Sequence, residues 1–128
     1  MPRRASRVES GQASVELALL LPLILLLLLA VLQVGLVARD VVLVTHAARE
    51  AARAAATDPA PDAARTAARA AGGLHPDRMS VDATGRQGAG SRVRVTVAYR
   101  IPTDVPLAGA LIGDLTVSRT VTMRVEGG

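Results

Sequence analysis

The chain has few aromatic side chains and no thiols. Its 128 residues include no Cys, no Trp, no Phe and a single Tyr. The missing cysteines exclude disulfides and thiolate metal sites. The shortage of aromatic rings disfavours stacking platforms for single-stranded nucleic acid. The formal net charge of +4 comes from arginines spread through an alanine-rich chain. This spread indicates a solvated basic surface, and we expect no nucleic-acid partner.

Residue patterns that support catalysis are also scarce. The aspartates after residue 57 are scattered among turn signals, where they usually form caps and turns. The glycines of GRQGAG, residues 85–90, do not lead from a strand into a helix as phosphate-binding loops do. His46 has no second His within helical reach, so a metal is not expected there. We predict that the chain is not an enzyme and has no catalytic, cofactor-binding or metal-binding residues.

Leucine is abundant and is gathered in one run. From Leu17 to Ala38 there is no charged residue and one polar side chain, Gln33. As a helix, at about 1.5 Å per residue, this run reaches about 33 Å, enough to cross a hydrocarbon core of about 30 Å. The rest of the chain offers too little apolar surface to wrap such a helix on all sides. The sequence therefore predicts a transmembrane helix.

Three residues interrupt the uniform leucine pattern. Pro22 removes a backbone hydrogen bond, so a kink is expected there. The kink is either a common feature of membrane helices or a device that helps the helix leave the bilayer. Gln33 and Gly35 are candidates for a helix-contact face.

The flank before the run is basic. Its arginines follow the positive-inside tendency, which predicts a cytoplasmic N-terminus and an extracytoplasmic C-terminal region. The three arginines are Arg3, Arg4 and Arg7.

A single carboxylate, that of Glu16, stands at the edge of the leucines. A charge there costs insertion energy unless it is paired. If the chain were cut after Gly11, Gln12 would carry a new amino group about one helical turn from Glu16. Packed helices would then allow the amino group of one chain to pair with the carboxylate of the next. Glu16 is therefore a candidate assembly residue, with the amino group of Gln12 as its partner if the chain is cut after Gly11.

The helix is expected to continue beyond the membrane with an amphipathic pattern. Small apolar residues recur at helical spacing up to Ala55, which suits close contact with a sheet or another helix. Arg49, Glu50 and Arg53 gather on the polar side as candidate contact residues, and Glu50 is positioned to pair with Arg53 or His46.

Turn signals and a second short helix follow. The stretch TDPAP, residues 57–61, ends the long helix. Asp62 is a candidate cap for a short helix through about Ala71, which Gly72 and Gly73 close.

From Met79 onward the apolar residues alternate with period two. Strands are expected near residues 79–84, over 93–101 with the clearest apolar face, and over about 115–125. Three strands are marginal alone, so their apolar face is expected to pack on the alanine-rich helix. Between the last two strands, Leu107, Leu111 and Ile112 lie in an apolar loop. The sequence leaves open whether they cover the sheet or contact another subunit.

The N-terminal motifs resemble a known family. A short basic leader ending in Gly11, a glutamate at the fifth following position and an apolar helix look like the class III signal of type IV pilins and pseudopilins. The run GQASVELALLLPLILLLLLAVLQVG, with THAAREAARAAA at its outer end, is more narrowly similar to TadE-like proteins of the tight-adherence (Flp) pilus system. The resemblance covers about the first 56 residues. It implies cleavage between Gly11 and Gln12 by a prepilin peptidase on the cytoplasmic side.

The resemblance and the residue patterns together imply an α+β, pilin-like fold. The expected organisation is a basic leader at 1–11, a transmembrane helix at 12–38, its extracytoplasmic continuation at 39–56, a turn and short helix at 57–76, and a small antiparallel β region at 77–128.

Two functions remain open at this point. The first is a minor pilin or pseudopilin, a structural subunit or assembly factor that packs with other pilin subunits and the assembly machinery. The second is an uncleaved single-pass anchor that displays a small extracytoplasmic binding or envelope-assembly module.

Overall fold

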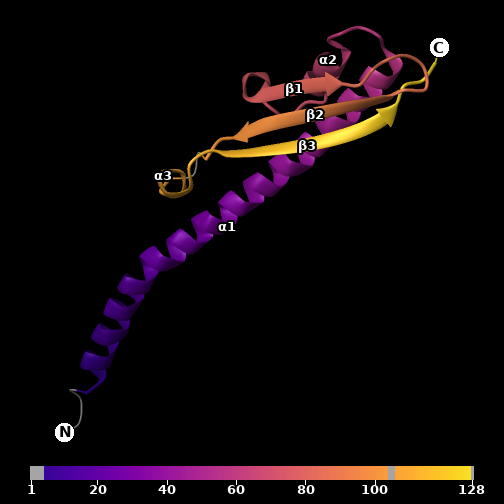
Figure 1. Ribbon diagram of the computed structural model, residues 1–128. Coiled ribbons are helices and arrows are strands. Elements are labelled where there is room, and N and C mark those ends of the chain that lie inside the picture. The colour runs from indigo at the N-terminus through magenta and orange to yellow at the C-terminus, as the bar shows by residue number, and fades with distance from the viewer. Residues whose placement is uncertain (1–4, 104–105, 128) are drawn as a thin grey trace.

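The computed structural model describes the backbone of residues 5–103 and 106–127, and the side chains of these residues except 5–10, 108 and 112. Arg3, Arg4 and the side chain of Arg7, expected to form the basic flank, lie outside the described residues. The elements are α1 (Ala5–Thr57), α2 (Ala63–Ala70), a 3-10 turn (Pro76–Arg78), β1 (Met79–Thr84), β2 (Arg92–Ile101), α3 (Ala108–Ile112) and β3 (Leu115–Arg124). The α+β class is confirmed (Figure 1).

Helix α1 is the longest element, with 53 residues. It continues through Pro22, and Figure 1 shows that it is curved. It ends at Thr57, as the TDPAP stretch predicts, and the Asp58 side chain accepts the Ala60 backbone N–H at 2.9 Å to form the following turn. The N-terminal half of α1 projects beyond the rest of the chain (Figure 1).

The three strands form one antiparallel sheet in the order β1-β2-β3. The central strand β2 pairs on one side with β1, where Val97 faces Val81, and on the other with β3, where Val97 faces Arg119. Thr96 and Thr120, also cross-strand neighbours, join their hydroxyls at 2.9 Å. The glycine-rich stretch 85–91 is the turn between β1 and β2.

The core lies between the outer half of α1 and one face of the sheet. The expected apolar face of β2 is fully buried, consisting of Val93, Val95, Val97, Tyr99 and Ile101. Opposite it, α1 buries Val44 and six alanines, Ala47, Ala48, Ala51, Ala52, Ala55 and Ala56. Because alanine has a small side chain, the strand and the helix approach closely, which confirms the predicted packing of the sheet on the alanine-rich helix.

The edge strands contribute less to this core. Met79 and Val81 on β1 are half-buried, whereas Ala83 at the end of the same face is exposed. On β3 the half-buried residues are Val117, Val121 and Met123.

Helix α2 packs on α1 through Ala64 and Ala68. Asp62 occupies its N-cap position, but the Asp62 side chain makes no capping hydrogen bond. The Asp62 carbonyl instead accepts the Thr66 N–H at 2.9 Å, as a first-turn carbonyl does in any helix. Gly72 and Gly73 end this segment with φ near +79° and +78°, a conformation that glycine adopts without strain.

Candidate assembly surface

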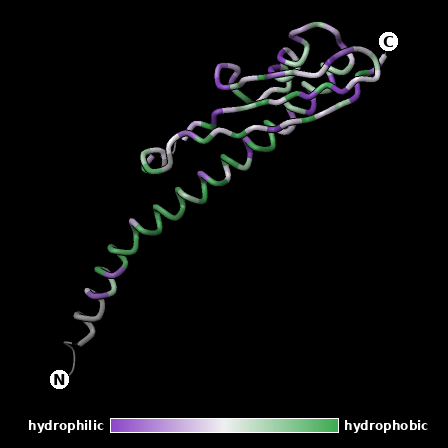
Figure 2. Tube along the Cα trace, viewed as in Figure 1, coloured by the Kyte–Doolittle hydropathy of each residue, from purple (hydrophilic) through white to green (hydrophobic). Residues whose placement is uncertain are grey.

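The apolar part of α1 is not covered by the rest of the chain. Every residue from 11 to 28 is exposed, and Figure 2 shows hydrophobic colouring along most of this part of the helix. Within the described residues, α1 is the one helix long and apolar enough to cross a membrane. Its exposure and length are consistent with a membrane protein.

The candidate processing and assembly residues lie near the start of this surface. Gly11, Gln12 and Glu16 all belong to α1 and are exposed. A side chain at Gly11 would meet nothing within 4 Å. Among the residues that the structure describes, Glu16 makes no ion pair, so its carboxylate is available to a partner outside the chain. Cleavage after Gly11 and the kink at Pro22 stay predictions.

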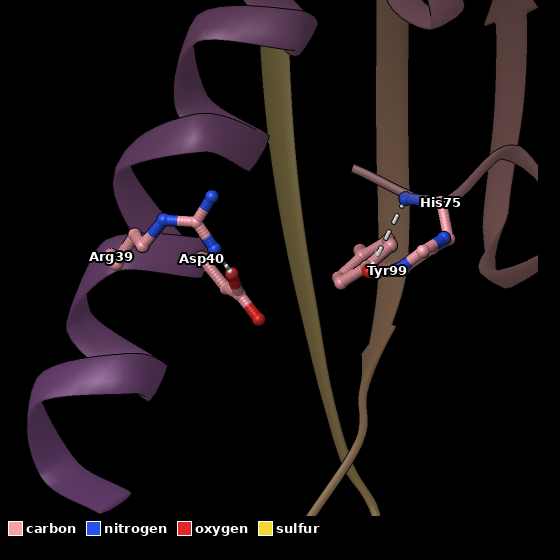
Figure 3. Close-up of polar contacts among 4 residues, drawn as sticks. All are labelled: Arg39, Asp40, His75 and Tyr99. Carbon is pink, nitrogen blue, oxygen red and sulfur yellow. Dashed lines mark hydrogen bonds and ion pairs between the residues drawn. The ribbon is translucent and has the colours of Figure 1, made fainter. Parts of the chain in front are cut away.

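The boundary between the apolar and amphipathic parts of α1 carries an ion pair. A guanidinium nitrogen of Arg39 lies 3.6 Å from a carboxylate oxygen of Asp40 (Figure 3). Arg39 is 62% exposed and Asp40 is 13% exposed. The pair contributes little to stability because one partner is largely solvated. It places two polar side chains of opposite charge, with almost no net charge, at the outer end of the apolar run.

The polar side of the outer half of α1 matches the expectation only in part. Arg49 and Arg53 are exposed and Glu50 is half-buried. The expected pairing of Glu50 with Arg53 or His46 is wrong, since Arg39–Asp40 is the ion pair found within the described part of the chain. Helical spacing permits such a pair but does not enforce it, because a solvated pair contributes little energy. Arg53 instead lines a shallow hollow with the end of β3, at residues 123–126.

Arg86 has a structural role that the sequence does not signal. Its guanidinium donates hydrogen bonds to the backbone carbonyls of Ala55 and Asp58, at the C-terminal end of α1. These carbonyls have no partner within the helix, and a cation there also complements the helix dipole. An arginine in a glycine-rich turn carries no pattern that predicts this contact.

Tyr99 joins the sheet to the segment that follows α2. Its ring is buried, and its hydroxyl accepts the backbone N–H of His75 at 3.4 Å (Figure 3). At the other end of the fold, the Glu126 N–H donates to the Ala56 carbonyl at 3.1 Å. These contacts hold the small sheet at a constant position along α1.

The sequence left two alternatives for the apolar loop before β3, which were to cover the sheet or to contact another subunit. The loop forms α3, which lies beside the apolar part of α1 and does not cover the sheet (Figure 1). Pro106, Leu107 and Leu111 line one hollow together with the Leu26–Val34 part of α1. The side chain of Ile112 lies outside the described residues. Contact of this loop with another subunit stays a prediction.

Gln33 is enclosed next to this loop. Its side chain is 5% exposed, and neither its amide nitrogen nor its amide oxygen has a hydrogen-bond partner within the described chain. Gly35, the other candidate for a helix-contact face, is exposed and has open space around its α-carbon.

Comparison with known proteins gives one match. No curated protein and no solved structure matches the chain. Residues 11–53 match the family model described as TadE-like protein. The matched residues begin at the candidate cleavage site, include the whole apolar run and end in the alanine-rich part of α1. This match confirms the resemblance seen in the sequence: over residues 11–53 the chain is TadE-like, consistent with a TadE-like protein of the tight-adherence pilus system.

Proposed function

We propose that this chain is a minor pilin or pseudopilin of the tight-adherence (Flp) pilus or a related secretion apparatus. Its role is structural, with no catalytic step: it is stored in the membrane and then assembles with other pilin subunits by helix packing. The alternative is an uncleaved single-pass anchor for a small extracytoplasmic module.

The division of α1 into two unlike halves carries this proposal. The outer half is buried by the chain's own sheet, through Val44 and the alanines that follow it. The inner half is apolar and exposed, with Leu19 73% and Leu23 62% exposed. Such a surface needs either lipid or neighbouring helices around it. A subunit that passes from the bilayer into a helical bundle uses both environments in turn.

Glu16 supports an assembly role beyond simple anchoring. A carboxylate directly before the leucines weakens membrane insertion unless it is neutralised. Removal of residues 1–11 by a prepilin peptidase creates an amino group on Gln12. The amino group of one subunit then pairs with Glu16 of its neighbour, which offsets the cost of burying both charges within packed helices.

The basic residues before Gly11 support the orientation. With Arg3, Arg4 and Arg7 on one flank and the nearly neutral Arg39–Asp40 pair on the other, the N-terminus is cytoplasmic and the sheet is extracytoplasmic. In this orientation Gly11 faces the compartment in which prepilin peptidases cut.

Leader removal is the step that tests the proposal. The intact mass and N-terminal sequence of the membrane-extracted protein are measured with and without a co-expressed prepilin peptidase. We expect a peptidase-dependent N-terminus at Gln12. Gly11→Leu should abolish it. Gly35→Leu is a matched control, because a side chain at either glycine meets nothing within 4 Å and neither substitution disturbs the chain's own packing.

Each result has a clear meaning. Loss of processing in Gly11→Leu alone supports the pilin route. An N-terminus that is unchanged by the peptidase favours the uncleaved anchor, and the roles given to Gly11 and Glu16 then fail.

A further inference from the structure

The segment of residues 106–113, here called the α3 segment, lies against the middle and outer part of the apolar run. It contacts α1 and encloses with it a hollow of about 350 Å³. Figure 1 places α3 at the end of the sheet that is nearer the projecting half of α1. The hollow is lined by Leu26, Leu29, Ala30, Gln33, Val34, Pro106, Leu107 and Leu111.

The outer surface of the α3 segment is apolar. Its sequence, PLAGALIG, has no polar side chain. Leu107 is 61% exposed and Leu111 is 85% exposed. Fully burying a leucine is worth about 1.5–3 kcal/mol, so two leucines on one short loop favour an apolar environment.

The backbone of the segment is suited to a place with little water. The Thr103 hydroxyl donates to the Gly113 carbonyl, and the Gly113 N–H donates to the Gly109 carbonyl at 3.2 Å. A side chain at position 109 would collide with the Thr103 carbonyl, so glycine is needed for this closure. Irregular backbone at membrane depth is tolerated where it is packed against protein, and α1 lies against one side of this segment.

Gln33 shows what the segment covers. Leu32 and Val34 on either side of it are 55% and 69% exposed, whereas Gln33 is 5% exposed. Among these three neighbours only Gln33 is shielded, although Val34 also lines the hollow beside the α3 segment. The α3 segment covers Gln33, the one polar side chain of the apolar run. Leucines of the segment are exposed there instead.

The depth of the contact follows from helix geometry. At about 1.5 Å per residue, Val34 lies about 6 Å and Leu26 about 18 Å from the outer end of the run at Ala38. Half of a hydrocarbon core is about 15 Å thick. If α1 spans the bilayer, the hollow between α1 and the α3 segment lies at hydrocarbon depth, from about 6 Å below the outer end of the run to near the bilayer centre.

We propose that the α3 segment is a membrane-inserted loop, which enters the bilayer beside α1 and presents Leu107 and Leu111 to lipid acyl chains. The inference rests on the membrane placement of α1 under the proposed function. Lipid is favoured over a second copy of the chain because membrane helices associate through small or polar side chains. The large exposed side chains of the loop are Leu107 and Leu111, and the nearby amide of Gln33 is already enclosed.

The absence of tryptophan from the chain allows a direct test. Single-tryptophan variants of the full-length protein are reconstituted at high lipid dilution into phosphatidylcholine vesicles with plain or brominated acyl chains. Leu111→Trp tests the loop. Leu28→Trp, at an exposed position of the apolar run, reports the membrane placement of α1. Thr66→Trp, exposed on α2, is the aqueous control.

We expect brominated lipid to reduce the emission of Leu111→Trp and Leu28→Trp about twofold or more, as for side chains in contact with acyl chains. Iodide in the water should quench only Thr66→Trp. If Leu28→Trp is quenched by lipid but Leu111→Trp is quenched by iodide, the loop proposal fails and the membrane span stands. If neither is quenched by lipid, the membrane placement itself fails. Protection of Leu111→Trp from both quenchers would mean that another chain covers the loop, which also overturns the proposal.

Discussion

The guanidinium of Arg86 donates a hydrogen bond to the backbone carbonyl of Ala55, near the end of a helix of 53 residues. The same group reaches the Asp58 carbonyl just beyond the helix. One side chain from the turn between β1 and β2 thus closes the C-terminal end of α1 and ties the sheet to it. The contact is charge-assisted, which makes it stronger than a hydrogen bond between neutral groups.

Replacing Arg86 by Gln should destabilise the folded outer domain. The loss leaves two helix-end carbonyls without their cationic donor, and we expect a decrease of about 1–3 kcal/mol in the free energy of unfolding. Urea unfolding of the detergent-solubilised protein measures it. Arg65→Gln, which removes an exposed arginine on α2, is the matched control. Equal midpoints for the two variants would show that the Arg86 contact contributes nothing.

Enlarging a buried alanine of α1 should disrupt the packing of helix and sheet. Ala48 is fully buried against the sheet side of the core. Ala48→Leu forces extra volume into the core that α1 shares with the sheet and α2, so a loss of about 1–3 kcal/mol is expected, or more if the sheet separates from the helix. Thermal unfolding followed by circular dichroism measures the change. Ala38→Leu, at an exposed position of the same helix, should leave the melting temperature unchanged; a similar loss in both variants would contradict the close-packing interpretation.

Replacing Gln33 by Leu should stabilise the contact between α1 and the α3 segment. The amide of Gln33 is enclosed and has no hydrogen-bond partner among the described residues. An unsatisfied buried polar group costs about 1–3 kcal/mol, and leucine of similar size removes that cost. Protection of the backbone amides of residues 109–113 from hydrogen exchange should increase. Gln87→Leu, in the exposed turn, is the control. Faster exchange in Gln33→Leu would show that the amide has a partner in the membrane.

Neutralising Glu16 should block assembly without affecting the fold. Glu16 is exposed and makes no ion pair with the described residues, so Glu16→Gln or Glu16→Ala removes the charge with little effect on the described core. Under the proposed function, membrane insertion is kept or improved while recovery in sheared pilus fractions falls to background. Immunoblotting of membrane and pilus fractions measures both. Glu50→Gln should assemble normally. Unchanged incorporation of both Glu16 variants would disprove pairing of Glu16 with a neighbouring amino terminus.

Much of the architecture could be predicted because its signals are local. The apolar run is long enough to indicate a membrane helix by itself. The alternation from Val93 to Ile101 predicts a half-buried strand, and its five alternate residues form the buried face of β2. TDPAP ends α1 where predicted. The family match, residues 11–53, lies in the part of the chain where the motif residues are specific.

The remaining features depend on contacts between residues far apart in the chain. Hydrophobic periodicity shows which face of a helix or strand is buried, but not what covers it. The Arg86 contact joins residues on a turn and a helix end, and the place of the α3 segment on Leu26–Val34 depends on where the sheet is held along α1. The pairing of Glu50 with Arg53 was wrong for the opposite reason, because helical spacing permits a surface pair that its small energy does not hold.

The sequence by itself therefore determined the membrane-length helix, the strand pattern and the similarity of residues 11–53 to TadE-like proteins, since these depend on residue type and spacing over short distances. Only the tertiary structure decided that α3 lies beside the apolar run, that Gln33 is enclosed and that Arg86 closes α1. The physical reason is that each of these contacts is formed when the sheet packs at one position along the alanine-rich half of α1. That position depends on side-chain packing and long-range hydrogen bonds, which no local pattern encodes.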